Sequence, residues 1–219
     1  MSGSVTIGLF VTAHNIGQYS SAAFDNVQVT IPANNPVPSP WVDTDVGSPA
    51  IGGSASYANN VFTVNGAGTD IWGTNDQFNY VYQPVTGDGN GTLIARVTSQ
   101  TNTSSNAKAG IMFKQSTTAG SPYILITVTP GTSSFKVQYN FNGSIGGGTY
   151  TFPNAWMKLT RVGTTFTAYV SADGVTWTQV LSKTLNFNTS ATAGLFECSH
   201  NANALGTATF DNVSFTPVP

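Results

Sequence analysis

Few residues of this chain have side chains suited to acid–base, nucleophilic or metal chemistry. Its 219 residues include two histidines, one cysteine and a single glutamate, Glu197. Glycoside hydrolysis needs two carboxyl groups flanking the scissile bond, and no glutamate accompanies Glu197. A Ser-His-Asp triad needs a histidine base, but His14 and His200 both stand in His-Asn pairs typical of turns. With Cys198 as the one thiol, zinc ligands are also too few. We therefore expect no enzymatic activity.

Aromatic and planar polar side chains are better suited to binding a sugar. An aromatic ring stacks on the apolar face of a pyranose, and amide, ammonium or guanidinium groups bond its hydroxyls. In several segments the polar residues alternate with apolar ones, so they share one face. We predict a ligand site on that face or in nearby loops, formed by Arg96, Lys108, Gln138, Asn140 and Trp72. The alternative is that these side chains form a solvated sheet face.

The segments that must position these residues are short and alternating. Typical examples are TLIARVTS (92–99), YILITVTP (123–130) and FKVQYNF (135–141), which are rich in β-branched and aromatic residues. Turn-forming Gly, Asn, Asp and Ser residues separate them. No segment keeps an apolar period of 3.6 residues, so we expect no long helix. This pattern predicts an all-β sandwich.

The two ends of the chain resemble one another. GLFVTAHNIGQYSSAAFDNV (8–27) aligns without a gap on GLFECSHNANALGTATFDNV (194–213), at an offset of 194 − 8 = 186 residues. Both stretches carry GLF, His-Asn and FDNV in the same places. An offset of that size, about one whole sandwich, indicates an internal repeat.

The repeat predicts the domain organisation. Residues 1–31 are expected to be two closing strands of a preceding repeat, 32–40 a Pro-rich linker, and 41–217 the complete module. The apolar side chains of residues 5–31 need a cover. They are expected to pack on the module in cis, to add to a neighbour's sheet, or to compete with the C-terminal copy for one place.

The composition argues against two classes of binding partner. Charged residues make up 7% of the chain and the net charge is −2. With so few Lys and Arg residues and no basic stripe, we expect neither nucleic acid nor a membrane surface as partner. The polarity comes from Ser, Thr, Asn, Gln and Gly, which favours an extracellular location. No secretion signal is recognised in the sequence, so a signal would lie upstream of it.

Several motifs together resemble a known family. They include WVDTDVG (41–47), AKAGIMF (107–113), LTRVGTTFTAYVSADGVTW (159–177) and TFDNV (209–213). Nearly all of residues 41–215 is similar to the bacterial "regulation of enolase"-type modules of the concanavalin A-like lectin/glucanase superfamily. The resemblance implies a jelly-roll β-sandwich of two antiparallel sheets. It also implies an extracellular setting, since such modules often accompany glycoside hydrolases.

The same resemblance implies a structural calcium ion where the last strand meets the start of the domain. The matching acidic positions are Asp211 and either Asp45 or Asp43. The alternative is that Asp211 caps a bend and Asp45 accepts a hydrogen bond from a turn N–H.

Two function hypotheses follow. The first is a non-catalytic carbohydrate-binding module of a secreted or cell-surface bacterial protein, with a polysaccharide or cell-surface glycan as partner. The second is a structural repeat of an extracellular surface or filament protein, assembled through strand addition or swapping.

Overall fold

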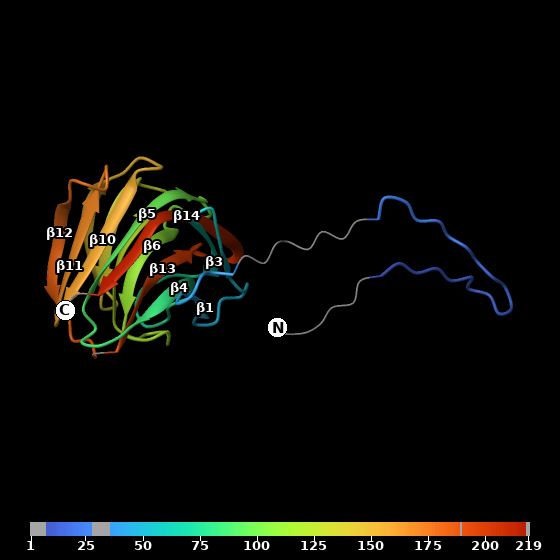
Figure 1. Ribbon diagram of the computed structural model, residues 1–219, viewed down its shortest axis with the longest axis horizontal. Coiled ribbons are helices and arrows are strands. Elements are labelled where there is room, and N and C mark those ends of the chain that lie inside the picture. The colour runs from blue at the N-terminus through green and yellow to red at the C-terminus, as the bar shows by residue number, and fades with distance from the viewer. Residues whose placement is uncertain (1–7, 28–35, 189, 218–219) are drawn as a thin grey trace. The chain divides into compact units, whose positions relative to one another are not determined.

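The computed structural model describes residues 8–27, 36–188 and 190–217. The chain divides into two compact units, residues 1–33 and 34–219. The larger unit contains all fourteen strands found in the described residues (Figure 1). The described part of the chain contains no helix that could cross a membrane.

Two antiparallel sheets of seven strands each make up the larger unit. In spatial order, sheet A consists of β1 (Val42–Val46), β4 (Phe78–Val85), β13 (Ala191–Cys198), β6 (Lys108–Lys114), β7 (Tyr123–Thr129), β8 (Ser134–Tyr139) and β9 (Gly143–Thr149). Sheet B consists of β12 (Thr178–Thr184), β11 (Thr165–Ser171), β10 (Ala155–Val162), β5 (Gly91–Gln100), β14 (Asn201–Pro217), β3 (Val61–Gly68) and β2 (Ser54–Ala58). The prediction of an all-β jelly-roll sandwich is confirmed.

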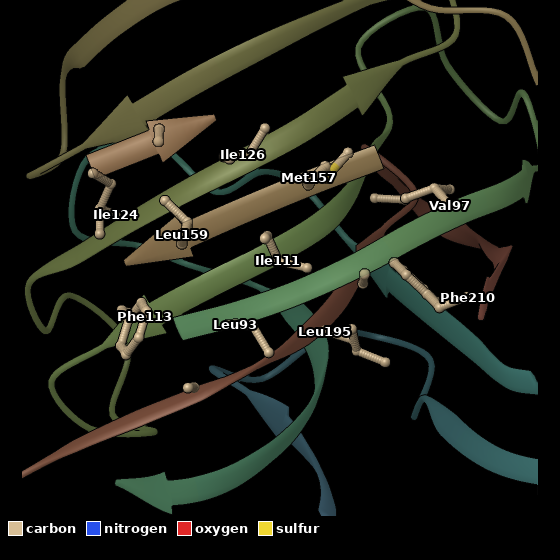
Figure 2. Packing of buried hydrophobic residues seen from close by; sticks show 14 of the residues in the cluster. Leu93, Val97, Ile111, Phe113, Ile124, Ile126, Met157, Leu159, Leu195 and Phe210 are labelled. Carbon is tan, nitrogen blue, oxygen red and sulfur yellow. The ribbon is translucent and has the colours of Figure 1, made fainter. Parts of the chain in front are cut away.

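Alternating residues of the two sheets meet in one core. On β5, Leu93, Ala95 and Val97 are fully buried while the residues between them are more exposed. Figure 2 shows Leu93 and Val97 beside their partners from both sheets. The labelled partners are Ile111, Phe113, Ile124, Ile126 and Leu195 of sheet A, and Met157, Leu159 and Phe210 of sheet B.

The last two strands, β13 and β14, join the two sheets of the sandwich. The segment of residues 194–213, which runs through both strands, is called the closing hairpin, although its strands belong to different sheets. β13 lies between β4 and β6 in sheet A, and β14 lies between β5 and β3 in sheet B. Between them His200 has a positive φ of 51°, which turns the chain from one layer to the other. Leu195, Phe196 and Phe210 of this hairpin are fully buried. Both sheets therefore depend on it for their continuity.

Residues 8–27 differ from the expectation of two strands. No strand occurs in this stretch, and Phe10 and Phe24 are 85% and 50% exposed. The parts of the predicted strands in residues 1–7 and 28–31 lie outside the described residues. A strand requires a pairing partner for its backbone groups. The counterparts of this stretch, β13 and β14, each pair with two neighbours. The division into 1–31, 32–40 and 41–217 stays a prediction.

Candidate functional site

A loop of the chain covers the outer face of sheet A. Residues 69–77, which connect β3 to β4, place the fully buried side chain of Ile71 against that face. Its neighbours form a second apolar cluster, outside the main core: Val46, Phe78, Tyr80, Met112, Tyr123, Leu125, Phe196 and Cys198. A sheet face that was expected to be open is thus partly filled by the protein itself.

Two ion pairs fasten this loop to β6. Lys114 Nζ lies 2.7 Å from the Asp76 carboxylate, and neither side chain is exposed. Lys114 also donates to the Ser121 carbonyl, at 3.0 Å, and the Gly120 N–H donates to Asp76, at 3.1 Å. Burial lowers the pKa of Lys114, although the Asp76 carboxylate acts in the opposite direction. The second pair, between Lys108 and Asp70, is partly open to solvent.

Beside the second ion pair lies a polar pocket of about 370 Å³. Trp72, from the covering loop, is 41% exposed at this pocket. Strands β6, β7, β8 and β9 each contribute lining residues to it. The residues that line it are Asp70, Trp72, Asn106, Lys108, Thr129, Lys136, Gln138, Ser144 and His200.

The pocket combines a stacking surface with several hydrogen-bonding groups. The Asp70 carboxylate accepts from Lys108 and lies 3.5 Å from Nε2 of His200. The Gln138 side chain is buried, and among the described residues its Oε1 atom has no hydrogen-bond partner. An aromatic ring beside amide, ammonium and carboxylate groups is the arrangement that a sugar ring and its hydroxyls require.

The structure brings together three of the five residues predicted to bind a ligand. Trp72, Lys108 and Gln138 all line the pocket. Asn140 does not; it lies in the turn after β8 with a positive φ of 42°. Arg96 does not either, because it belongs to sheet B.

Arg96 points away from the core, but on the other side of the sandwich. Its neighbours Ala95 and Val97 are buried between the sheets, so Arg96 faces outward from sheet B. Its Nε donates to Asp211, at 2.7 Å, and its guanidinium lies 5.2 Å from the centre of the Trp156 ring. The expectation that Arg96 meets Lys108 and Gln138 is therefore wrong. Alternation shows that a residue points outward but not from which sheet.

The two carboxylates expected at a calcium site also lie apart. Asp45 accepts from the Gly53 N–H, at 3.0 Å, and from the Asn79 amide, at 3.3 Å. Asp45 pairs with Asn79 on the inner side of sheet A, whereas Asp211 follows the buried Phe210 on sheet B and pairs with Arg96. Asp45 thus accepts from the N–H of Gly53, the residue that precedes β2. Calcium binding stays a prediction.

Six residues of the pocket were not among those predicted: Asp70, Asn106, Thr129, Lys136, Ser144 and His200. Asp70 and His200 are residue types that also stabilise turns. A role in a turn was therefore a sufficient explanation for each, and neither was predicted to belong to a site. Lys136 shares the outward face of β8 with Gln138. Alternation was therefore the one sequence signal by which it could have been predicted. Asp70 lies at the pocket because the covering loop folds onto sheet A, and local sequence patterns do not predict where that loop folds.

A second aromatic surface lies on the outer face of sheet B. Lys158 Nζ is 4.4 Å from the centre of the Tyr169 ring and 4.3 Å from that of Trp177. Trp156 and Arg96 continue this surface along β10 and β5. Cations cover the rings here, so less ring face is free for a ligand than at Trp72.

Comparisons with known proteins inform the fold. No protein-family model and no curated protein matches this chain. A functionally unknown protein from Saccharomyces cerevisiae superimposes with a TM-score of 0.65 at 18% identity, over 81% of this chain and 97% of that one. A prokaryotic β-1,3-1,4-glucanase (lichenase) from a mouse hindgut metagenome gives a TM-score of 0.54 at 10% identity, over 81% and 93% of the two chains.

A longer structure contains the same sandwich as one part. The GH43B protein of a Bacteroides ovatus xyloglucan locus gives a TM-score of 0.53 at 14% identity, over 89% of this chain and 42% of that one. At these identities the likenesses show the fold alone, a jelly-roll β-sandwich of two antiparallel sheets.

Proposed function

We propose that the sandwich is a non-catalytic carbohydrate-binding module of a secreted or cell-surface bacterial protein. The observation that carries this proposal is Trp72, an exposed ring held at the rim of a polar pocket. The covering loop and its buried Lys114–Asp76 pair fix the position of that ring. A pre-formed site of this kind loses little freedom when it binds.

Its chemistry favours binding over catalysis. Among the described residues that line the pocket, Asp70 supplies the carboxylate, and this group is engaged by Lys108. The lichenase and the xyloglucan-locus protein share the fold, which supports a glucan as ligand. The sparse charge and the abundance of Thr and Asn support an extracellular setting.

Replacing Trp72 tests the proposed site. The Trp72→Ala protein should bind at least about tenfold more weakly, because the stacking surface is lost. Binding would be measured by affinity electrophoresis and calorimetry with mixed-linkage β-glucan and xyloglucan, with and without EDTA. An EDTA effect would support a bound cation.

Trp177→Ala is the matched control, because it removes a tryptophan from the surface on sheet B. It should bind as the wild type does. Equal loss in both variants, or loss in Trp177→Ala alone, would reject the pocket as the binding site. Absence of binding to any polysaccharide of a glycan array would reject the function itself.

The internal repeat favours a second candidate function, a structural repeat of an extracellular surface or filament protein. Exposed apolar side chains of residues 8–27 supply material for association between chains. Size-exclusion chromatography with light scattering would separate the two candidates. Concentration-dependent chains or fibres support the structural repeat, and a monomer at all concentrations contradicts it.

A further inference from the structure

The exposed apolar residues of the N-terminal stretch match buried residues of the closing hairpin. Leu9 and Phe10 are 57% and 85% exposed, while their counterparts Leu195 and Phe196 are fully buried. Phe24 is 50% exposed, and its counterpart Phe210 is fully buried as well. An apolar side chain that large gains roughly 1.5–3 kcal/mol on burial. Residues 8–27 therefore have the pattern required to fill the place of residues 194–213.

The backbone of the stretch also matches. His14 has a φ of 52° and His200 a φ of 51°. Asn26 and Asn212 agree in the same way, at 51° and 50°. Positive φ is uncommon outside glycine, so two such agreements at equivalent positions are informative. The N-terminal stretch thus has positive φ at the same two positions as the closing hairpin, the turn at His200 and the irregularity of β14 at Asn212, although it contains no strand.

One pair of substitutions between the two copies is physically linked. In the closing hairpin Glu197 of β13 faces Gly206 of β14, and a Cβ atom at Gly206 would lie 2.2 Å from Glu197 Oε1. The N-terminal copy has the shorter Val11 in place of Glu197 and Ser20 in place of Gly206. A shorter side chain on one strand thus accompanies the larger one on the other. This compensation is expected only if positions 11 and 20 pack together as 197 and 206 do.

The residue types that make two polar contacts of the closing hairpin recur in the N-terminal copy. His200 lies against Asp70 in the pocket, and Asp211 pairs with Arg96. The equivalent residues are His14 and Asp25. An exchange would keep both the pocket histidine and the ion pair.

We propose that residues 8–27 are an interchangeable closing hairpin, able to replace residues 194–213 in the sandwich of the same chain. The segment that connects residues 8–27 to the sandwich is long enough for this exchange. The 14 residues from 28 to 41 span up to roughly 45 Å when extended. The ring of Trp41 lies 5.3 Å from that of Phe62, and Phe62 pairs with Phe210. The start of β1 is thus close to the place that Phe24 would take, and linkage within one chain favours exchange in cis.

Matched substitutions in the full chain test this proposal. Phe24→Asp alone should melt as the wild type does, because the resident hairpin stays in place. Phe210→Asp should keep a cooperative unfolding transition, because the N-terminal hairpin takes over. The double variant Phe24→Asp/Phe210→Asp should lose that transition. Circular dichroism and near-ultraviolet spectra follow all three.

Limited chymotrypsin digestion shows which hairpin is inserted. In the wild type, cleavage should begin after Phe10 and Tyr19, which are exposed. In Phe210→Asp it should move to Phe196. The proposal is overturned if Phe210→Asp unfolds as completely as the double variant, or if the double variant folds as Phe210→Asp does. A folded Phe210→Asp dimer would place the exchange between two chains and overturn the intramolecular form.

Discussion

Glu197 is a carboxyl group without the usual means of holding a charge. Its side chain is fully buried, and among the described residues neither carboxylate oxygen has a hydrogen-bond partner. Burial raises the pKa of Glu197 well above its usual value, so the neutral acid is favoured in the folded protein. Its side chain lies outside the polar pocket and faces Gly206 of β14.

The titration of Glu197 gives a stability prediction. Because its folded pKa is above its unfolded pKa, its contribution is most favourable below the unfolded value of about 4.3 and falls as pH rises toward the folded value. Glu197→Gln removes this ionisation. Relative to the wild type, the variant should therefore gain stability as pH rises from 4 to 8.

Urea unfolding at several pH values measures that difference. Asp88→Asn, which replaces an exposed carboxylate in the loop before β5, is the control. A constant difference in unfolding free energy between Glu197→Gln and the wild type would show that the pKa of Glu197 is the same in the folded and unfolded states, and would contradict the raised folded pKa.

At the scale of elements, the loop of residues 69–77 determines where the site lies. Sequence alternation predicted the strands and the outward direction of Lys108 and Gln138. It did not show that Arg96 stands on the other sheet, because each sheet of a sandwich has its own outward face. Nor did it show that Asp70 and Trp72 fold onto sheet A, because that placement depends on long-range contacts of Ile71 and Asp76.

The ion pairs that hold this loop should differ in weight. Asp76→Ala leaves Lys114 buried without its partner, which should cost about 3–5 kcal/mol. Asp70→Ala breaks a partly exposed pair of the same loop, and should cost less than about 1 kcal/mol. Equilibrium unfolding in guanidinium chloride compares the two. Equal costs would contradict the view that the Asp76 contact is the main fastening.

For the whole molecule, the sequence predicted the repeat but did not predict whether each copy forms strands. The match between residues 8–27 and 194–213 predicted strand-forming residues correctly for the C-terminal copy alone. Residues 8–27, the described part of the N-terminal copy, form no strand, whereas β13 and β14 each pair with two neighbours. Strand formation thus depended on partners that a local sequence pattern does not contain.

Removing residues 1–31 should leave the sandwich folded with an unchanged melting temperature. The strands and core described for the larger unit come from residues beyond that segment. Differential scanning calorimetry of the shortened protein measures this. A fall of more than a few degrees would mean that the segment is an integral part of the sandwich and that the predicted boundary is wrong.

The interior positions of β13 and β14 have a consequence for synthesis. A nascent polypeptide that has emerged up to β12 contains β1 and β4 apart from β6–β9, and β10–β12 with β5 apart from β2 and β3. Four strand edges, two per layer, then face solvent without backbone partners. Unless residues 8–27 take that place first, folding completes when the final hairpin leaves the ribosome, and prematurely terminated products without either hairpin in place should be prone to aggregate.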